Sequence, residues 1–519
     1  MVVTLCVVLL AGFPAAFSLA GVAILYAIIA LSFGVFDLSF IKPLPQRIFG
    51  AVSNTTLIAV PMFILMGVIL EKAKIAEELL DEMAKLFGSL PGGLGISVTI
   101  VGALLAASTG IVGATVVTMG LLSLPTMLRR GYDPAFASGA IAAAGTLGQI
   151  IPPSIVLILL GDVISNAYQK AQLEQGVFAP ETISVGDLFA GALIPGLMLV
   201  GLYLVWQIIV AVTAPAKAPA IPAAEMAASR KEVWKAAMRT LPPPLLLIIA
   251  VLGSILAGAA TPTEAASVGA IGALLIAGAR IGGDGSLITG RTPVFLAALA
   301  IVGLIGLTSF LDLRLGRESI SALEQAGIVA AFALCLIAPW GVCVSLLRLA
   351  REKTLAPIAD QTARVTTMVF TILIGAALFS LVFRGLGGDE TVRHALEATP
   401  GGRAGAVITV MLVMFVLGFF LDFIEITLVV VPLVGPPLLA MGVDPVWLGI
   451  MMAINLQTSF LTPPFGFALF YLRGVAPAAV RTGDIYRGAL PFIAIQILAL
   501  ALLALFPGLA TWLPGVLYR

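Results

Sequence analysis

The chain has 519 residues, of which 60% are hydrophobic and 11% charged, and its net charge is +1. This composition excludes a soluble protein, which could not bury so much apolar surface, and it indicates a polytopic membrane protein. The near-zero charge gives no electrostatic case for nucleic-acid binding. The single histidine, and three cysteines in apolar runs without metal-ligand spacing, predict no cofactor and no transition-metal centre.

Apolar runs of roughly twenty residues or more predict membrane helices, because that length crosses the hydrocarbon core. In chain order these runs are 3–34, 55–71, 133–161, 187–213, 242–260, 264–280, 292–311, 326–347, 365–384, 445–472 and 488–513. We interpret the first run as a retained helix and not a cleaved signal peptide, since no basic region or small-residue cleavage site accompanies it. The expected fold is an all-α polytopic membrane protein with about eleven transmembrane helices.

Polar segments between these runs indicate the orientation. Segment 71–89 alternates charged with apolar residues, which predicts an amphipathic helix along the membrane interface. The connections 214–240 and 348–364 are basic and are expected in the cytoplasm, whereas the acidic connection 162–187 is expected in the periplasm. Segment 385–403, which holds the histidine and two arginines, is taken as a polar connection.

Two further segments, 94–128 and 404–440, are each about 35 residues long and are interrupted near the centre by small or polar residues. Such a length suits a re-entrant hairpin of two short helices, each crossing half the membrane. Non-helical backbone at a hairpin tip is tolerated only inside protein or beside a water-filled cavity.

A repeated pattern follows each hairpin. Asp133-Pro134 precedes the tandem prolines Pro152-Pro153, and Asp444-Pro445 precedes Pro463-Pro464, with every member displaced by 311 residues. Because proline removes a backbone N–H, both pairs predict a break inside a membrane helix. Counting spans from the charged connections orients the two copies oppositely. Inverted repeats with broken helices are typical of secondary transporters, which bind substrate and ions near the bilayer midplane.

The first copy offers neutral oxygens and exposed backbone. Its hairpin tip contains Ser108, Thr109, Gly110 and Thr115, and its helix break contains Gly145, Thr146, Gly148, Gln149 and Ser154. Hydroxyls and freed carbonyls at such points suit Na⁺, and a helix N-terminus suits a carboxylate. Ordinary small-residue packing between membrane helices is the alternative explanation for the tip.

The second copy places more polar side chains before its prolines. They are Asn455, Gln457, Thr458, Ser459 and Thr462. We expect Na⁺ near Ser108, Thr109, Gly110, Gly145, Thr146 and Gly148, and near Asn455, Gln457, Thr458 and Thr462. The substrate contacts are expected from Thr115, Gln149, Ser154 and Ser459. Hydrogen bonds between helices are the alternative for the second set.

Asp422 and Glu425 lie three residues apart in the second hairpin, and therefore on one helical face. A charge at membrane depth costs roughly 2.5–3.5 kcal/mol on insertion scales. Coupling to a cation or proton, pairing with a buried arginine, and a position in water at the mouth of the protein all remain open. The first hairpin has Ile111 and Ala114 at the equivalent positions, so the two copies are not functionally equal.

Four motifs in order resemble the large membrane subunit of the tripartite ATP-independent periplasmic (TRAP) transporters, over nearly the whole chain. The motifs are 129–134, 145–154, 261–266 and 455–464. The resemblance implies a bacterial inner-membrane, Na⁺-coupled importer of organic acids with an elevator mechanism. It also implies two partners, a small four-helix membrane subunit and a periplasmic substrate-binding protein.

Two departures from the family pattern narrow the resemblance. The first tip has Thr109-Gly110 where most members have a serine-rich sequence, and the second hairpin has Asp422-Phe423-Ile424-Glu425 where many have Asp-Pro. These features resemble the branch for mannitol, chloroaromatic compounds and 2-oxo acids, so a small 2-oxo, hydroxy or aromatic carboxylate is the expected substrate.

The division expected from these segments alternates scaffold and transport parts. It comprises an N-terminal scaffold with its interfacial arm (1–93), a first transport repeat (94–186), further scaffold helices (187–403), a second transport repeat (404–474) and a C-terminal helix (475–519). A stand-alone ion-coupled organic-anion transporter or antiporter with paired hairpins is the alternative function. An enzyme is not expected, because the sequence has no histidine pair and no Gly-x-Ser-x-Gly elbow.

Overall fold

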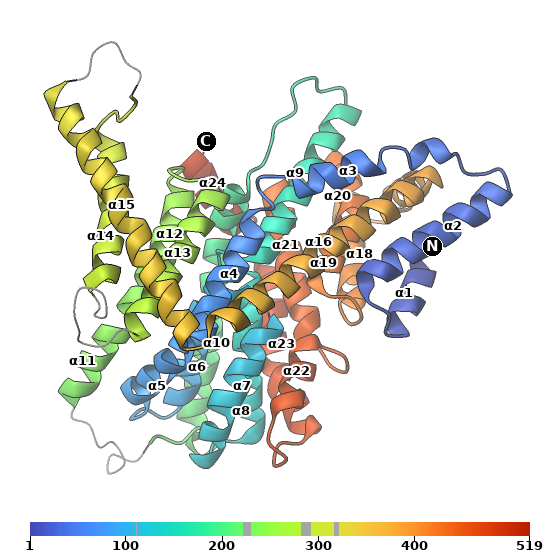
Figure 1. Cartoon of the computed structure of the whole chain (residues 1–519). Helices are drawn as coiled ribbons and strands as arrows, with labels where there is room; N and C mark the ends of the chain where they lie inside the picture. The colour runs from blue at the N-terminus through green and yellow to red at the C-terminus, as the bar shows by residue number, and fades with distance from the viewer. Residues whose placement is uncertain (111, 222–229, 282–291, 316–320, 519) are drawn as a thin grey trace.

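The computed structural model describes residues 1–110, 112–221, 230–281, 292–315 and 321–518, and the side chains of 106–109 and 230 lie outside this description. Within these residues the chain forms only helices (Figure 1). Nine of the described helices are long and apolar enough to cross a membrane, or ten if the bent pair in 423–440 counts as one span. The expected all-α membrane fold is confirmed. Fewer long helices appear than expected because runs 133–161 and 445–472 are broken and 55–71 forms a shorter helix.

The N-terminal part differs from its prediction. The expected single helix 3–34 is two helices, α1 (Val2–Leu10) and α2 (Ala15–Ser32). Gly12 has φ +87 and Pro14 has no N–H to donate, so the helix ends before them and restarts after. The short helix η1 (Leu38–Phe40), α3 (Leu44–Val52) and α4 (Ala59–Lys72) follow.

The first of two modules spans residues 75–213. Its elements are α5 (Ile75–Phe87), α6 (Gly93–Thr109), α7 (Val112–Arg129), α8 (Pro134–Thr146), η2 (Leu147–Gln149), α9 (Ile155–Glu174) and α10 (Val185–Thr213). Helix α5 is the expected amphipathic helix, with its apolar face buried. Helices α6 and α7 form the expected first hairpin, and the interruption between α8 and α9 contains Pro152-Pro153.

A second group of helices joins the modules. It consists of η3 (Pro215–Lys217), α11 (Arg230–Thr240), α12 (Pro242–Leu256), α13 (Pro262–Ile281), α14 (Thr292–Phe310), α15 (Ala322–Arg351) and α16 (Leu355–Gly385). Helices α14 and α15 pack on each other and on α13, at one side of the molecule (Figure 1). Helix α16 of this group, together with α4, contacts the modules: α4 packs on α6, and α16 packs on α19.

The second module spans residues 388–518. Its elements are α17 (Gly388–Glu397), α18 (Gly402–Leu417), α19 (Phe423–Val429), α20 (Val431–Ala440), α21 (Pro445–Leu461), α22 (Phe467–Val475), α23 (Thr482–Leu505) and α24 (Gly508–Tyr518). Segment 385–403, taken as a connection, contains the amphipathic α17. The run 488–513 is also two helices, since Pro507 separates α23 from α24.

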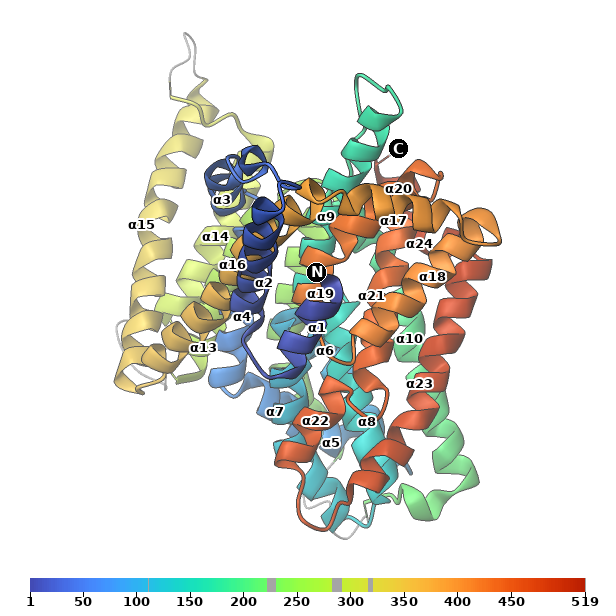
Figure 2. The same cartoon turned by 90° about the vertical axis from the view of Figure 1, so that its right-hand side faces the viewer.

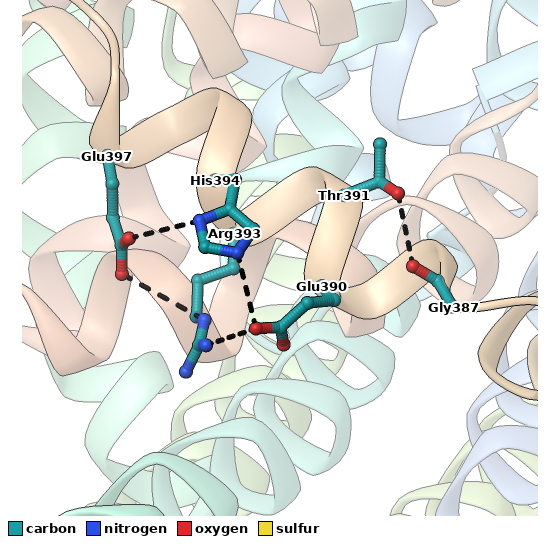
Figure 3. A network of polar contacts seen from close by, with 6 residues as sticks. All are labelled: Gly387, Glu390, Thr391, Arg393, His394 and Glu397. Carbon is teal, nitrogen blue, oxygen red and sulfur yellow. Dashed lines mark hydrogen bonds and ion pairs between the residues drawn. The ribbon is translucent and has the colours of Figure 1, made fainter.

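Segment 385–403 was predicted as a connection because the exposed face of α17 is charged. Along its exposed face Glu390, Arg393, His394 and Glu397 form ion pairs with one another one turn apart (Figure 3). Only Leu396 is buried. The histidine therefore belongs to a solvated helix face and not to an irregular loop.

The two modules are inverted relative to each other. Figure 2 shows α5 with the first hairpin toward one end of the molecule, which we name the α5 end, and α17 with the second hairpin toward the opposite α17 end. The displacement of 311 residues relates the start and end of α7 (Val112, Arg129) to the start of α19 (Phe423) and the end of α20 (Ala440). The predicted inversion is confirmed.

The modules are interlocked across this symmetry. The second arm of each hairpin packs on the helix that follows the other module's break, α7 on α22 and α20 on α9. Helix α8 packs on α23 with backbones in contact, because a Cβ on Gly139 would lie 2.0 Å from the Gly488 carbonyl oxygen. The result places both hairpin tips and both helix breaks in the middle of one body.

Candidate functional site

The first hairpin tip lies directly against the first helix break. Helix α6 ends at Thr109, Gly110 turns the chain with φ +60, and α7 starts at Val112. A Cβ on Gly110 would lie 3.0 to 3.3 Å from the Ile155 side chain and backbone nitrogen, at the start of α9. The backbone of the first tip therefore lies beside the start of α9, at the first break. The side chains of Ser108 and Thr109 lie outside the described residues.

Gln149 is the most unusual residue of the first break. Its side chain is wholly buried, and among the described residues neither its amide oxygen nor its amide nitrogen has a hydrogen-bond partner. The Ser154 hydroxyl donates to the Gln149 carbonyl at 2.9 Å, which closes the break, and Pro152 and Pro153 are buried around it. A buried amide without partners is rare in native proteins, so Gln149 is the strongest ligand-binding candidate.

The predicted hydroxyls of the second break are bonded to their own helix. Thr458 donates to the Ile454 carbonyl at 2.8 Å, Ser459 to Leu456 at 2.7 Å, and Thr462 to Thr458 at 2.7 Å. Such bonds use the hydroxyl hydrogens and leave oxygen lone pairs available to a cation. Gly418, at the second hairpin tip, lies against Ser459 so closely that a Cβ there would clash with its hydroxyl oxygen.

Two of the predicted residues meet across the symmetry. Thr146 and Gln457 are equivalent positions 311 residues apart, and the Gln457 amide donates to the Thr146 hydroxyl at 3.2 Å. The Gln457 Oε1 atom is buried without a partner. The first and second sets of expected ion ligands therefore approach each other at this bond.

Other predicted residues lie apart from this centre. Asn455 points toward the first arm of the second hairpin, where its amide donates to the Met411 carbonyl at 2.8 Å. Thr115 is buried on α7 below the first tip. Pro463 is half-buried and Pro464 exposed, unlike Pro152 and Pro153, so the second break is open to the surface where the first is closed.

Tyr203 and Gln496 complete the central network and were not predicted. The Gln496 amide donates to the Tyr203 hydroxyl at 2.7 Å, and both side chains are wholly buried. The Tyr203 hydroxyl also lies beside the Thr146 and Gln457 side chains. A polar residue within an apolar membrane run is itself a signal of a functional site, and this signal was present in both runs.

The carboxylates of the second hairpin occupy a helix cap. Asp422 accepts the Phe423 N–H at 2.8 Å, and Glu425 accepts the Asp422 N–H at 3.2 Å, which together make a capping box for α19. Across the described part of the chain, neither carboxylate has an arginine or lysine within ion-pair distance. The pairing with a buried arginine is therefore not observed there.

Tyr471 lies between the two hairpins and was also missed. It is on α22, close enough to Asp422 to sense its charge. A Cβ on Gly113, the second residue of α7, would lie 2.9 Å from the Tyr471 ring. Tyr471 is 40% exposed, so the region near the hairpin tips is open to the surface at this residue.

These features have a clear counterpart among known proteins. The family described as Tripartite ATP-independent periplasmic transporter, DctM component, matches residues 2–509. The chain belongs to this family of TRAP transporter large permeases. It is a multi-pass protein of the inner membrane and a transporter subunit, and not an enzyme.

Relatives of known name support the same assignment over the full length. The C4-dicarboxylate TRAP transporter large permease protein DctM of Vibrio cholerae is 28% identical and covers 96% of each chain. The ectoine TRAP transporter large permease protein TeaC of Halomonas elongata is 27% identical, covering 100% of this chain and 99% of its own. The sialic acid TRAP transporter large permease protein SiaM of Vibrio cholerae is also 27% identical, with coverages of 98% and 96%.

A solved structure shares the fold. The YdaH transporter of Alcanivorax borkumensis, described as having an unusual topology, superposes with a TM-score of 0.53 at 14% sequence identity. The match covers 91% of this TRAP permease and 88% of that chain. It supports the helical arrangement alone.

Proposed function

We propose that this TRAP permease is the large subunit of a Na⁺-coupled importer of a small organic acid, working with a small four-helix membrane subunit and a periplasmic binding protein. The observation that carries the proposal is the central cluster. The two breaks bring neutral oxygens together inside an apolar body, and Gln149 and Gln457 contribute buried amide atoms that have no partner among the described residues. Neutral oxygens in a dry site suit Na⁺, which shares the hard-cation preference for oxygen ligands.

Its substrate site is proposed at the centre of the two tips, near Gln149, Ser154, Ser459 and Thr115. Relatives at similar identity are named for C4-dicarboxylates, sialic acid and ectoine. These solutes differ in size but all carry a carboxylate. A 2-oxo, hydroxy or aromatic carboxylate is the class that we propose for this chain.

An elevator movement is proposed for the transport step. The moving body comprises the hairpins and broken helices, and we include α10 and α23 because both pack on them. The arms α5 and α17 connect this body to the remaining helices. Equivalent carboxylates on the arms, Glu78 and Asp389, pair with Arg280 of α13 at 2.6 Å and with Lys170 of α9 at 2.9 Å.

Reconstituted transport tests this proposal. Proteoliposomes containing both membrane subunits, supplied with the binding protein, should accumulate a radiolabelled organic acid only with an inward Na⁺ gradient. Undiminished uptake after collapse of the gradient would reject Na⁺ coupling. Equal uptake without the binding protein would favour the alternative, a stand-alone ion-coupled transporter.

A substitution in the central cluster, compared with a control outside it, tests the role of the cluster in Na⁺ coupling. Gln457→Leu removes the amide at the symmetry axis, and Gln172→Leu serves as a matched control because its amide binds only the Glu181 backbone near the surface. We expect Gln457→Leu to weaken Na⁺ dependence and the control to transport like the unaltered protein. Equal effects of the two substitutions would remove the assignment.

A further inference from the structure

The two modules differ in the side chains that pack on the first helix of each hairpin, α6 in the first module and α18 in the second. In the first module the Gln207 amide donates to the Thr99 hydroxyl at 2.5 Å, and both side chains are wholly buried between α10 and α6. Helices α10 and α23 both carry an aspartate at the same helical position, Asp187 and Asp484, 297 residues apart. These displacements make Val410 the counterpart of Thr99, and Ala504 the counterpart of Gln207.

The smaller counterparts leave space in the second module. Leu500 stands where Tyr203 stands in the first module, and Ala504 where Gln207 stands. Between α18, α21 and α23 the structure has a groove of about 880 Å³, within the range of roughly 300–1,000 Å³ for small-molecule sites. Its lining is mostly apolar and includes Met411, Phe415, Trp447, Met451, Leu500 and Ala504.

The groove opens on a surface that faces lipid. Helices α18 and α23 lie on the same side of the molecule in Figure 2, and beside the groove Ile408, Leu412 and Ile497 are each more than half exposed. Water gains few hydrogen bonds in an apolar groove, and an empty one forfeits dispersion contacts. At membrane depth a hydrocarbon chain is the natural filling.

A cation lies at the end of the groove where α18 begins, at the α17 end of the molecule. Arg403 is exposed at the start of α18, one turn after α17, and its Nη1 donates to the Gly442 carbonyl at 3.1 Å. Within the residues described, no carboxylate lies within ion-pair distance of it. Asp444 also lines this end, but its carboxylate caps α21 by accepting the Trp447 N–H at 2.9 Å.

We infer that this groove binds one membrane phospholipid, with an acyl chain along α21 and the phosphate against Arg403. Basic positions beside gaps between membrane helices recognise anionic headgroups. The lipid takes the place that Gln207 and Tyr203 fill in the first module, and so supports the first arm of the second hairpin. A helix of a protein partner fits less well. Three turns of a helix about 10 Å across occupy on the order of 1,300 Å³, which exceeds the groove volume of about 880 Å³.

Native mass spectrometry of the purified permease tests the inference without any transport measurement. The unaltered protein should retain one phospholipid after delipidation in mild detergent. The triple variant Val410→Thr, Leu500→Tyr, Ala504→Gln rebuilds the first module's filling and should lose that lipid. Retention of the same lipid by this variant, or no lipid on the unaltered protein, would overturn the inference.

Further variants guard against misfolding and test the headgroup. The single substitution Ala504→Phe fills the groove with less change and should also lose the lipid, whereas Leu490→Phe, on an exposed part of α23 outside the groove, should keep it. In nanodiscs with phosphatidylglycerol and phosphatidylcholine, Arg403→Gln should abolish preference for the anionic lipid. An unchanged preference would reject the role of Arg403, and a diazirine lipid that labels peptides outside α18, α21 and α23 would reject the groove.

Discussion

The first and second modules have the same helices in the same order, yet their centres are built differently. In the first, the prolines of the break are buried and α6 is tied to α10 by Gln207. In the second, Pro464 is exposed, a groove separates α18 from α23, and the hairpin carries Asp422 and Glu425. The first module is therefore a packed half-site and the second an open, charged one.

The largest effect is expected at Gln149, the wholly buried amide of the packed half. Gln149→Met should reduce Na⁺ or substrate affinity by roughly 5- to 150-fold, because a ligand that loses a buried partner loses about 1–3 kcal/mol. Since the Gln149 side chain has no partner in the part of the chain that the structure describes, the thermal unfolding midpoint without ligand should not fall. Transport and ligand-induced thermal shifts measure the two parts. A large loss of stability with intact ligand response would contradict the ligand role.

The carboxylates of the open half provide the next test. Asparagine caps a helix about as well as aspartate, so Asp422→Asn keeps the cap and removes the charge. If the carboxylate couples a cation or proton, this variant should change the cation or pH dependence of uptake. Asp422→Ala should in addition lower stability by about 0.5–2 kcal/mol. Wild-type transport by Asp422→Asn and by Glu425→Gln would leave only the capping function.

A smaller effect is expected where the halves join. Tyr203→Phe removes the hydroxyl that accepts the Gln496 amide and should lower stability by about 1–3 kcal/mol, because a buried amide is left without its partner. The matched change Leu500→Phe, at the equivalent position beside the groove, should have little effect on stability. Thermal unfolding in detergent compares them. Equal destabilisation would show that the network does not join the modules.

The smallest effect is expected at the arms. Lys170 and Asp389 are about one-third exposed, and such pairs contribute about 0.2–1 kcal/mol. Lys170→Met should therefore change stability little, but it should alter the rate of transport if the ion pair breaks when α9 moves past α17. Arg280→Met, on the arm pair of the first module, is the matched comparison. Identical rates for both variants and the unaltered protein would remove the arms from the transport step.

Much of the fold follows from the sequence because its signals are local. Apolar length located the membrane helices, tandem prolines located both breaks, and the displacement of 311 residues related the two hairpins. Errors occurred where a short local signal opposed a longer pattern. Gly12 and Pro14 divided an apolar run, and Pro507 divided another. The many charged residues of α17 led to its prediction as a connection, although it is an amphipathic helix.

The candidate site was predicted only in part. The sequence identified Thr146 and Gln457 as polar residues at two breaks, but their mutual hydrogen bond depends on how the breaks cross. Tyr203 and Tyr471 were missed because their polar neighbours, Gln496 and Asp422, are far away in the sequence. The expected ion ligand Asn455 donates its amide N–H to the Met411 carbonyl, a contact that the sequence did not indicate.

By itself, the sequence determined a membrane protein with two inverted, interrupted modules, since hydrophobic length and missing proline N–H groups act within one segment. Tertiary structure alone decided which equivalent residues meet, that Asp422 and Glu425 cap a helix, and that one module is filled where the other has a groove. These outcomes depend on the volumes and hydrogen bonds of side chains brought together from distant segments, and periodicity carries no information about such partners.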